Sequence, residues 1–257
     1  MPSYAVLGAT GNVGSALLEV LLKTPDAEVR AYVRSKAKLL RMRPDLADND
    51  RVRIHEGGID DIARVTDCIS DTKAVFLAVG LSENVPYCTI MQDTAHSVLS
   101  AMKQLRAQDT HCRHPRLVVL SSASLDAHLC RDLPRFAHSV LLMGSSWIYA
   151  DLRAAEELLR SQEHWVKAVF VKPAGLVHDR QQGHKLSTDR QQTFLSFLDL
   201  AGGMVEVAEE DDDYWEMKNV SVLPTAKDVK IEWWVPWYMA KGLLFHFCPG
   251  LYPYLMG

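Results

Sequence analysis

Three glycines near the amino terminus could bind a phosphate. Gly8, Gly11 and Gly14 stand between the apolar residues 4–7 and a helical pattern that begins directly afterwards. Glycine allows a tight turn and close approach of the backbone to a phosphate, and a helix N-terminus offers unsatisfied N–H groups with partial positive charge. We therefore expect this turn to bind a pyrophosphate; a plain turn is the alternative. The amides involved belong to Thr10, Asn12 and Val13.

A cluster of cations follows the second apolar run of the chain. Arg34 ends that run, and Lys36 and Lys38 come next. At this point a dinucleotide enzyme contacts the adenosine ribose, where an acidic residue selects NAD and repels the phosphate of NADP. A guanidinium can bind that phosphate with two hydrogen bonds, and lysines add charge. The cluster predicts NADP(H) as the cofactor; the alternative is that these cations only solvate the start of a helix.

The elements that position these residues alternate along the chain. Apolar β-branched runs predict strands at 4–8, 27–34, 51–57, 73–80, 116–122 and 166–173. Helical patterns occupy 13–23, 36–42, 61–69, 86–106 and 147–161. Such alternation predicts an α/β fold with a doubly wound, mostly parallel sheet covered by helices on both faces.

The alternation fades in the last third of the chain. Residues 202–224 predict one or two late strands around an acidic turn at 209–213, whose adjacent charges favour solvation. The tail 231–257 is rich in aromatic residues but too interrupted by proline, lysine and glycine to suit a bilayer span. We expect it to form a helix that caps the substrate cleft or the core; a dimer contact and membrane-surface association are the alternatives.

Composition narrows the class of protein. A length of 257 residues suits one generous domain, and a net charge of −4 with no basic stripe argues against nucleic-acid binding. The five cysteines are dispersed and no signal peptide is visible, which together predict reduced thiols and a cytoplasmic location. The stretch His111–His114 lacks a second pair of metal ligands and is predicted to be a solvated loop, so no metal is expected.

The glycine spacing in "GATGNVG" resembles that of the extended and atypical short-chain dehydrogenase/reductase superfamily. The resemblance covers about the first 180 residues and implies an NADP-binding Rossmann domain at 1–180. Residues 181–257 are then a small C-terminal substrate-binding or cap region integrated into the same domain. The resemblance also implies further cofactor contacts, at Asp60, Ala78, Gly80, Ser121, Lys172, Pro173 and Gly175. His178 is a candidate substrate contact, with a solvated loop histidine as the alternative.

Members of this superfamily usually carry a serine or threonine after the fifth strand and Tyr-x-x-x-Lys on the next helix. The resemblance implies that Ser122 hydrogen-bonds the reacting oxygen and that Tyr149, 27 residues later, exchanges a proton with it. Arg153 stands where the lysine is usual. Residues four apart share a helix face, so a cation still lies beside the phenol. The planar guanidinium does not replace an ammonium at the ribose hydroxyls without repositioning.

Four further phrases resemble the averufin oxidase A family: "YADLRAAEELLR", "FVKPAGLVHD", "SFLDLAGGMVEVAEE" and "MKNVSV". That family implies a fungal enzyme of aromatic polyketide biosynthesis, in secondary metabolism that yields anthraquinones, xanthones and aflatoxin-type products. Aromatic side chains of the tail would suit a flat polycyclic substrate by stacking, with core filling as the alternative. They are Trp233, Trp234, Trp237, Tyr238 and Phe245.

Three hypotheses for function follow. The first is an NADPH-dependent oxidoreductase acting on a carbonyl or quinone of an aromatic polyketide. The second is a redox-neutral enzyme on the same scaffold, catalysing ring opening, dehydration or isomerisation. The third is a non-catalytic dinucleotide-binding sensor, because a fold alone does not fix a function.

Overall fold

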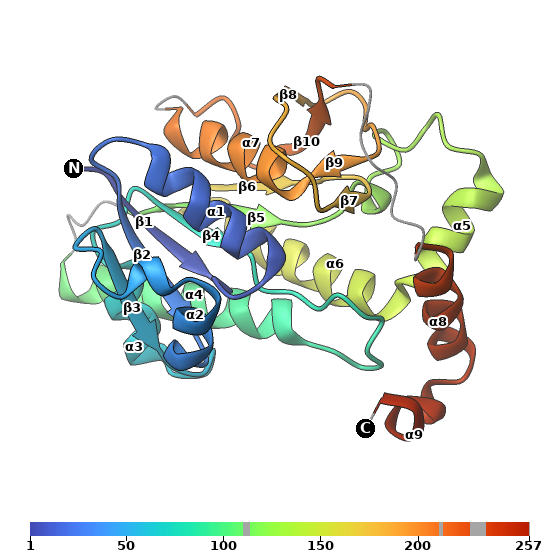
Figure 1. Cartoon of the computed structure of the whole chain (residues 1–257), viewed down its shortest axis with the longest axis horizontal. Helices are drawn as coiled ribbons and strands as arrows, with labels where there is room; N and C mark the ends of the chain where they lie inside the picture. Colours follow the sequence, from blue (N-terminus) through green and yellow to red (C-terminus); the bar gives the residue numbers. More distant parts are fainter. Residues whose placement is uncertain (110–113, 211–212, 227–234, 257) are drawn as a thin grey trace.

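The computed structural model contains an eight-stranded sheet with helices on both faces (Figure 1). It describes residues 1–109, 114–210, 213–226 and 235–256. The strand order is β3-β2-β1-β4-β5-β6-β10-β8, and only the pair β10 and β8 is antiparallel. The strands are β1 (Ser3–Leu7), β2 (Glu28–Val33), β3 (Val52–Glu56), β4 (Ala74–Leu77), β5 (Arg116–Leu120), β6 (Ala168–Val171), β8 (His184–Ser187) and β10 (Asn219–Pro224). A separate parallel pair joins β7 (Leu176–Val177) to β9 (Leu195–Ser196).

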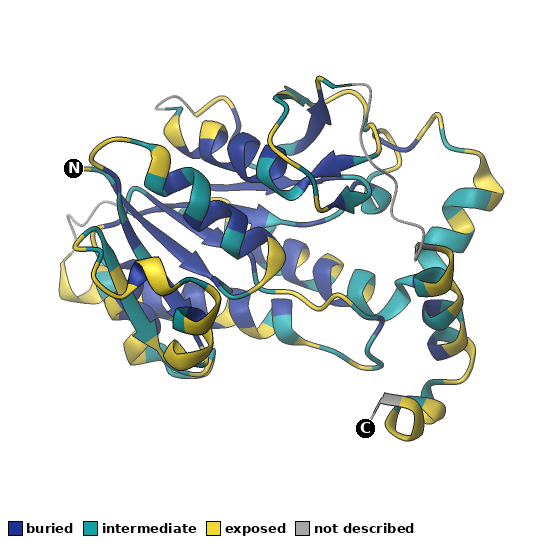
Figure 2. Ribbon diagram, viewed as in Figure 1, coloured by how far each residue is buried: buried dark blue, intermediate teal, exposed yellow. Residues whose placement is uncertain are grey.

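Side chains alternate between two buried cores, one on each face of the sheet. In β1, Tyr4 and Val6 enter one core, and Ala5 and Leu7 enter the other. The first core is covered by α1 (Asn12–Lys23), α2 (Lys36–Met42) and α7 (Phe197–Glu209). The second core is covered by α3 (Ile62–Ile69), α4 (Ile90–Gln108) and α6 (Ser146–Arg160). Figure 2 shows the strands buried between these layers, so the predicted doubly wound parallel sheet is confirmed.

The strand order reverses between β1 and β4. In open α/β sheets the ligand crevice lies outside the carboxyl ends of the strands at such a reversal. We call that side of the sheet the carboxyl edge and the opposite side the amino edge. Beyond the carboxyl edge lie α5 (Arg135–Gly144), α8 (Val235–Phe247) and α9 (Tyr252–Met256) (Figure 1). Short 3-10 turns occur at η1 (Pro44–Leu46), η2 (Ala123–Leu125) and η3 (Pro249–Leu251).

The strand predicted at the start of 202–224 is wrong, because residues 202–209 belong to helix α7. The Ser196 hydroxyl caps this helix: it accepts from the Asp199 N–H at 2.9 Å and donates to the Asp199 carboxylate at 2.7 Å. Gly203 lets the helix pack closely, since an added Cβ would lie 2.8 Å from a methyl of Val222. Because the helix is buried nearly all round, its sequence lacks the alternation of apolar and polar residues that marks a helical period. The second predicted strand is β10, and residues 211–212 of the acidic turn lie outside the described residues.

Helix α4 begins at Ile90, four residues later than predicted from the sequence. Its N-terminus is capped by the buried carboxylate of Asp151, on α6. That carboxylate accepts from the N–H groups of Met91 at 2.9 Å and Gln92 at 3.0 Å. The negative charge also faces the positive end of the helix dipole. A cap supplied from 60 positions away leaves no local signal in the sequence, which is why the boundary was missed.

Candidate active site

The glycine turn lies at the carboxyl edge, between β1 and α1. Gly8 has a φ of +88°, and a Cβ there would lie 2.7 Å from the carbonyl oxygen of Ala78. A Cβ on Gly14 would overlap the carbonyl oxygen of Gly8. The Gly11 N–H donates to that same oxygen at 2.9 Å, and α1 starts at the next residue, Asn12. The turn therefore has the shape that lets a phosphate approach the helix N-terminus, and it fits a dinucleotide.

The cations predicted to select NADP stand at the end of β2. Arg34, Lys36 and Lys38 are all exposed there. Ser35 caps α2, because its hydroxyl accepts from the N–H of Lys38 at 3.2 Å. The Lys36 N–H donates to the carboxylate of Glu56 at 3.0 Å. Glu56 comes from β3, so the sequence gave no indication that an acid lies within this basic cluster.

The predicted adenine contact lies in the loop between β3 and α3. Asp60 is exposed, and a Cβ added to Gly58 would overlap its carboxylate. The loop is tied to β2, since the Tyr32 hydroxyl donates to the carbonyl of Gly58 at 2.7 Å. Burial raises the pKa of Tyr32 to about 12, with a smaller contribution from Asp61, so the phenol stays protonated as a donor. The hydrogen bond from the neutral Tyr32 phenol thus holds the loop that carries Asp60 near the end of β2.

The end of β4 borders the glycine turn directly. The carbonyl of Ala78 is the group that would meet a Cβ at Gly8, and its N–H donates to Leu7 at 3.0 Å. Gly80 is exposed, and an added Cβ there would have nothing within 4 Å. Of these two predicted cofactor residues, Ala78 is therefore buried against the turn and Gly80 faces open space.

Ser122 and Tyr149 meet at the carboxyl edge. The Ser122 hydroxyl donates to the Tyr149 hydroxyl at 3.3 Å. Ser122 follows β5 and caps η2, where its oxygen accepts from the N–H of Ser124 at 3.3 Å. Tyr149 lies in the first turn of α6, and both side chains are half-buried. The structure thus brings together the two hydroxyls that the resemblance assigns to the reacting oxygen. Arg153, one turn further along α6, is exposed.

A buried ion pair contacts Ser121, the residue directly before Ser122. Lys172 and Glu156 are 1% and 8% exposed, and the ammonium lies 2.8 Å and 2.9 Å from the two carboxylate oxygens. The Ser121 hydroxyl donates to the same carboxylate. Lys172 and Ser121 were both predicted to contact the cofactor, and that assignment stays a prediction. The structure gives each of them a protein partner, Glu156, that the sequence did not indicate.

The segment after β6 runs along the same edge. The carbonyl of the buried Pro173 accepts from Ala123 at 2.9 Å, which joins this segment to η2. The Gly175 N–H donates to the Thr193 hydroxyl at 3.1 Å, and a Cβ on Gly175 would lie 2.6 Å from that oxygen. His178 is exposed, with its ring centroid 4.6 Å from that of Phe197.

Helix α8 packs against α5 and the start of α6 beyond the carboxyl edge (Figure 1). The crossing with α5 is close, because a Cβ on Gly242 would overlap the carbonyl oxygen of Gly144. Asn84 joins the elements: its amide donates to the Gly242 carbonyl at 3.0 Å and accepts from the Trp147 N–H at 2.9 Å. The described part of the tail therefore contains the predicted helix, while its role as a cap of the substrate cleft or the core stays a prediction.

The aromatic side chains of the tail differ in their burial. Burial raises the pKa of Tyr238 to about 12, and the neighbouring phenol of Tyr149 adds to that rise. Phe245 is buried at 1% exposure, whereas Trp237 is 68% exposed. Trp233 and Trp234 lie outside the described residues. Among the described stacking candidates, Phe245 therefore fills the core and Trp237 faces solvent, while stacking of Tyr238 on a substrate stays a prediction.

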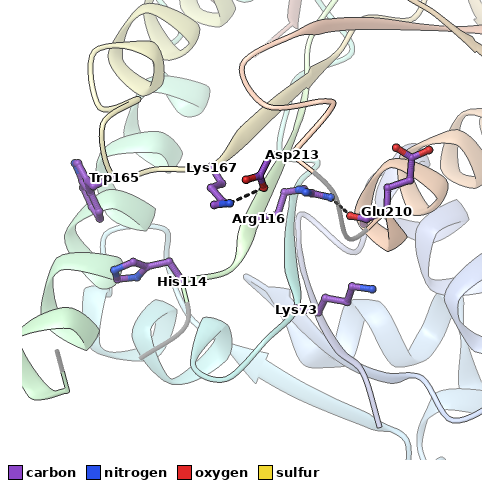
Figure 3. A pocket seen from close by; sticks show the side chains of 8 residues that line it. Lys73, His114, Arg116, Trp165, Lys167, Glu210 and Asp213 are labelled. Carbon is purple, nitrogen blue, oxygen red and sulfur yellow. Dashed lines mark hydrogen bonds and ion pairs between the residues drawn. The ribbon is translucent and has the colours of Figure 1, made fainter. Parts of the chain in front are cut away.

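A separate cleft of about 220 Å³ lies at the amino edge (Figure 3). Its cations contact acids: Lys167 lies 2.5 Å from Asp213, and Lys73 lies 3.3 Å from Glu209. None of the predicted site residues lines it. The residues that do are Lys73, His114, Arg116, Trp165, Lys167, Ala208, Glu210 and Asp213.

No group of three His, Cys, Asp or Glu side chains could hold a metal within the part of the chain that the structure describes. His111, Cys112 and Arg113 fall outside that part. Across the same described residues, every helix is too short or too polar to cross a membrane.

Comparison with known proteins agrees with this geometry. A family model described as NAD(P)H-binding matches residues 8–211, which include the glycine turn, Ser122 and Tyr149. The chain is 47% identical to Oxidoreductase aflX of Aspergillus parasiticus, over 99% of this chain and 95% of that one. It is 49% identical to Oxidoreductase stcQ of Emericella nidulans, over 99% and 94% of the two chains.

Solved structures show the same fold at low identity. A short-chain dehydrogenase/reductase from Veillonella parvula in complex with NADP gives a TM-score of 0.62 at 18% identity, covering 89% of this chain and 97% of that one. ChuY, an anaerobillin reductase from Escherichia coli O157:H7, gives 0.64 at 15% identity, covering 90% and 100%. The predicted Rossmann fold, enzyme class and nicotinamide dinucleotide cofactor are confirmed. The chain therefore belongs to the NAD(P)H-binding family of Rossmann-fold proteins and is an oxidoreductase.

Proposed function

We propose that this enzyme uses NADPH to reduce a carbonyl or quinone of an aromatic polyketide, or catalyses the reverse oxidation. The observation that carries the proposal is the 3.3 Å hydrogen bond between the hydroxyls of Ser122 and Tyr149 at the carboxyl edge. Two hydroxyls at this separation can hold one substrate oxygen between them. They stand on the side of the sheet where the glycine turn opens, so a bound dinucleotide and a substrate oxygen would share one crevice.

Two groups of residues at the carboxyl edge would bind the phosphates of the cofactor. The amides of Thr10, Asn12 and Val13 would bind the pyrophosphate, and Arg34, Lys36 and Lys38 would bind the 2′-phosphate. When bound, the reduced nicotinamide supplies the hydride. The remaining contacts to the adenosine and nicotinamide ends would come from Asp60, Ala78, Gly80, Ser121, Lys172, Pro173 and Gly175.

Tyr149 would donate its phenolic proton to the substrate oxygen as negative charge develops there, and solvent would restore that proton. Ser122 orients the same oxygen. Its own oxygen already accepts from the Ser124 N–H, so its proton points toward Tyr149 or a substrate. Arg153 would support the phenolate by its charge from one turn away. Hydride and proton together convert a carbonyl to an alcohol, so the step balances.

The substrate class rests on aromatic side chains and on the relatives. Tyr238 on α8 is one candidate for stacking, and the rings of Tyr87 and Trp147 lie 4.4 Å apart at the start of α6. Flat rings stack on such faces. The fungal oxidoreductases aflX and stcQ resemble the whole chain, including α8. A fungal aromatic polyketide is thus the proposed substrate, while a cytoplasmic location and pairing of two copies stay predictions.

One observation favours a second function. The side chain of Arg153 is exposed, and the superfamily places a lysine at its position. Without an ammonium at the ribose, the same two hydroxyls could catalyse a redox-neutral step such as dehydration or isomerisation, with the dinucleotide bound but not consumed.

Turnover of the cofactor separates the two functions. The purified enzyme is mixed with NADPH and an anthraquinone, or with NADP and the matching anthrahydroquinone, and nicotinamide absorbance and product chromatography are followed together. Product formation with a matching change in nicotinamide supports the oxidoreductase. Product without that change supports the redox-neutral alternative. Binding of NADPH with no product, and no effect of Tyr149→Phe on any measured property, would overturn both and leave a dinucleotide sensor.

A further inference from the structure

The buried pair Glu156–Lys172 lies where it can control the geometry of the reaction centre. Glu156 is seven residues after Tyr149 on α6, which places both on one face of the helix, two turns apart. Ser121, which donates to the Glu156 carboxylate, directly precedes Ser122. One carboxylate therefore contacts the strand end that carries Ser122 from the helix that carries Tyr149.

Lys172 completes the link from a third element. It follows β6, and its ammonium contacts both oxygens of Glu156, at 2.8 Å and 2.9 Å. β6 pairs with β5 along its length, with Val171 beside Leu120. The ammonium thus holds the carboxylate over the ends of both strands. Electrostatic attraction is strong in such a buried place because water does not screen it.

The network continues under the loop that Ser122 caps. Asp126 closes η2 by accepting from the N–H groups of His128 at 2.8 Å and Leu129 at 3.1 Å. Its second oxygen accepts from the Asn219 amide at 2.6 Å. Burial alone would raise the pKa of Asp126, but these hydrogen bonds and the charge of Lys172 lower it. The carboxylate therefore stays charged and fixes the loop on the far side of Ser122.

Arg160 ties the same network back to α6. Its guanidinium donates to the side-chain oxygen of Asn219 at 2.6 Å and to the carbonyl of Met217 at 2.6 Å, and lies 3.8 Å from Glu156. The buried face of α6 therefore bears a row of polar groups, Tyr149, Glu156 and Arg160, at spacings of two turns and one turn. Each group in this row contacts a different part of the sheet edge.

We propose that Glu156, held by Lys172, is a positioning residue that sets the separation of the Ser122 and Tyr149 hydroxyls. The proposal rests on the proposed function in taking that pair as the reaction centre. Under this proposal Lys172 and Ser121 hold Glu156 in place, either in addition to contacting the cofactor or instead of contacting it. It also explains how the site keeps a defined geometry although Arg153 is exposed.

Fluorine NMR on 3-fluorotyrosine-labelled, NADP-loaded protein tests this placement without needing a substrate. Tyr149→Phe assigns the Tyr149 resonance. Glu156→Gln removes the charge that holds Lys172, and Glu157→Gln, at the next and exposed position of α6, is the matched control. We expect Glu156→Gln to move the Tyr149 resonance and its titration midpoint, and Glu157→Gln to leave both at the wild-type values.

Ser121→Ala keeps the ion pair intact and removes only the hydroxyl that contacts Glu156, so it serves where Glu156→Gln does not fold. It should move the Tyr149 resonance in the same direction. With an anthraquinone that the wild type reduces, both variants should lower kcat by tenfold or more, on the order expected for a small misplacement of reacting groups, with KM within about twofold. A Tyr149 resonance that stays unchanged in both folded variants would overturn the proposal.

The two proposals fail in different ways. Absence of any NADPH turnover by the wild type would count against the proposed function and would leave the NMR result standing. An unshifted Tyr149 resonance in an enzyme that reduces anthraquinone would count against the positioning role alone.

Discussion

The carboxyl edge and the amino edge both gather cations, but the two clusters face different partners. At the carboxyl edge, Arg34, Lys36 and Lys38 are exposed, and no carboxylate lies within salt-bridge distance of their side chains among the described residues. At the amino edge, Lys167 lies 2.5 Å from Asp213. A cation that already has an acid beside it gains little from a ligand phosphate, whereas an exposed one gains a charged partner.

The backbone also differs between the two edges. At the carboxyl edge the chain bends at Gly8 with positive φ, and a helix begins at once. At the amino edge, Arg116 donates to the carbonyl of Val207 at 3.1 Å, and Lys73 donates to the carbonyl of Glu209 at 3.0 Å. These cations therefore bind carbonyl groups at the C-terminal end of α7, where the helix dipole is negative. The cations of the amino edge thus stabilise the end of α7, whereas the carboxyl edge carries the glycine turn proposed to bind the dinucleotide.

The largest expected effect is on chemistry. Tyr149→Phe removes the proposed proton donor but keeps the ring, so kcat with NADPH and an anthraquinone should fall by about a hundredfold or more. Tyr214→Phe, at an exposed tyrosine near the amino edge, should leave kcat unchanged. Initial rates of nicotinamide absorbance change measure both. Equal rates for wild type and Tyr149→Phe would contradict the assigned role.

Cofactor binding should respond next most strongly. In Gly14→Ala the new Cβ overlaps the carbonyl oxygen of Gly8, so α1 must shift and carry its first amides away from the turn. Strain of about 1–3 kcal/mol corresponds to roughly fivefold to 150-fold weaker NADP binding, measured by titration calorimetry. Gly250→Ala is the control, because an added Cβ there meets nothing within 4 Å. Undiminished binding by Gly14→Ala would place the dinucleotide elsewhere.

Much of the carboxyl edge could be predicted from the sequence because its signals are local. The glycine turn, the cations after β2 and the alternation of strands and helices each fall within a short window. Ser122 and Tyr149 are 27 residues apart, and only the resemblance to a family linked them. Their contact follows from a parallel crossover that returns α6 over the end of β5.

The missed features depend on packing between distant segments. Asp151 caps α4 from another helix, and Glu156 meets Lys172 only once β6 lies beside β5. Gly144 and Gly242 come together across 98 residues, and neither has a pattern that marks it as a helix crossing. The strand predicted at the start of 202–224 is instead part of α7, where Gly203 lets the helix approach Val222 of β10.

Cofactor choice tests the difference between exposed and acid-bound cations. Arg34→Ala should remove a charge-assisted contact of about 1.5 kcal/mol with the 2′-phosphate and lower the preference for NADPH over NADH about tenfold. Lys167→Ala, at the amino edge, should leave the preference unchanged. Thermal-shift curves with NADPH and NADH, read as ligand-linked stabilisation, supply the comparison. If the preference for NADPH survives in Arg34→Ala, Arg34 does not select the cofactor. The selection then belongs to Lys36 and Lys38, or this cluster does not select the cofactor at all.

The smallest expected effect is on stability in acid, and it compares one carboxylate at each edge of the sheet. Hydrogen bonds, opposed by burial, lower the pKa of Asp126 at the carboxyl edge, while a hydrogen bond from Lys167 lowers the pKa of Asp213. An unfolded aspartate has a pKa of about 3.9, so each carboxylate adds stability that is fully present above about pH 4. That stability is lost as the pH falls through the lowered pKa of the folded state.

Salt should distinguish the two cases. Asp126 is bound chiefly by backbone and amide N–H groups, which salt screens little, so Asp126→Asn should flatten the acid side of the stability curve at low and high salt alike. The size should stay below about 1 kcal/mol. Asp213 is exposed and paired with a lysine, so Asp213→Asn should flatten the curve at low salt only. Urea unfolding at about pH 6 and about pH 3, with and without about 1 M salt, measures both. A contribution from Asp126 that vanishes in salt as completely as that of Asp213 would mean that its carboxylate is stabilised by the charge of Lys172 rather than by the loop it closes.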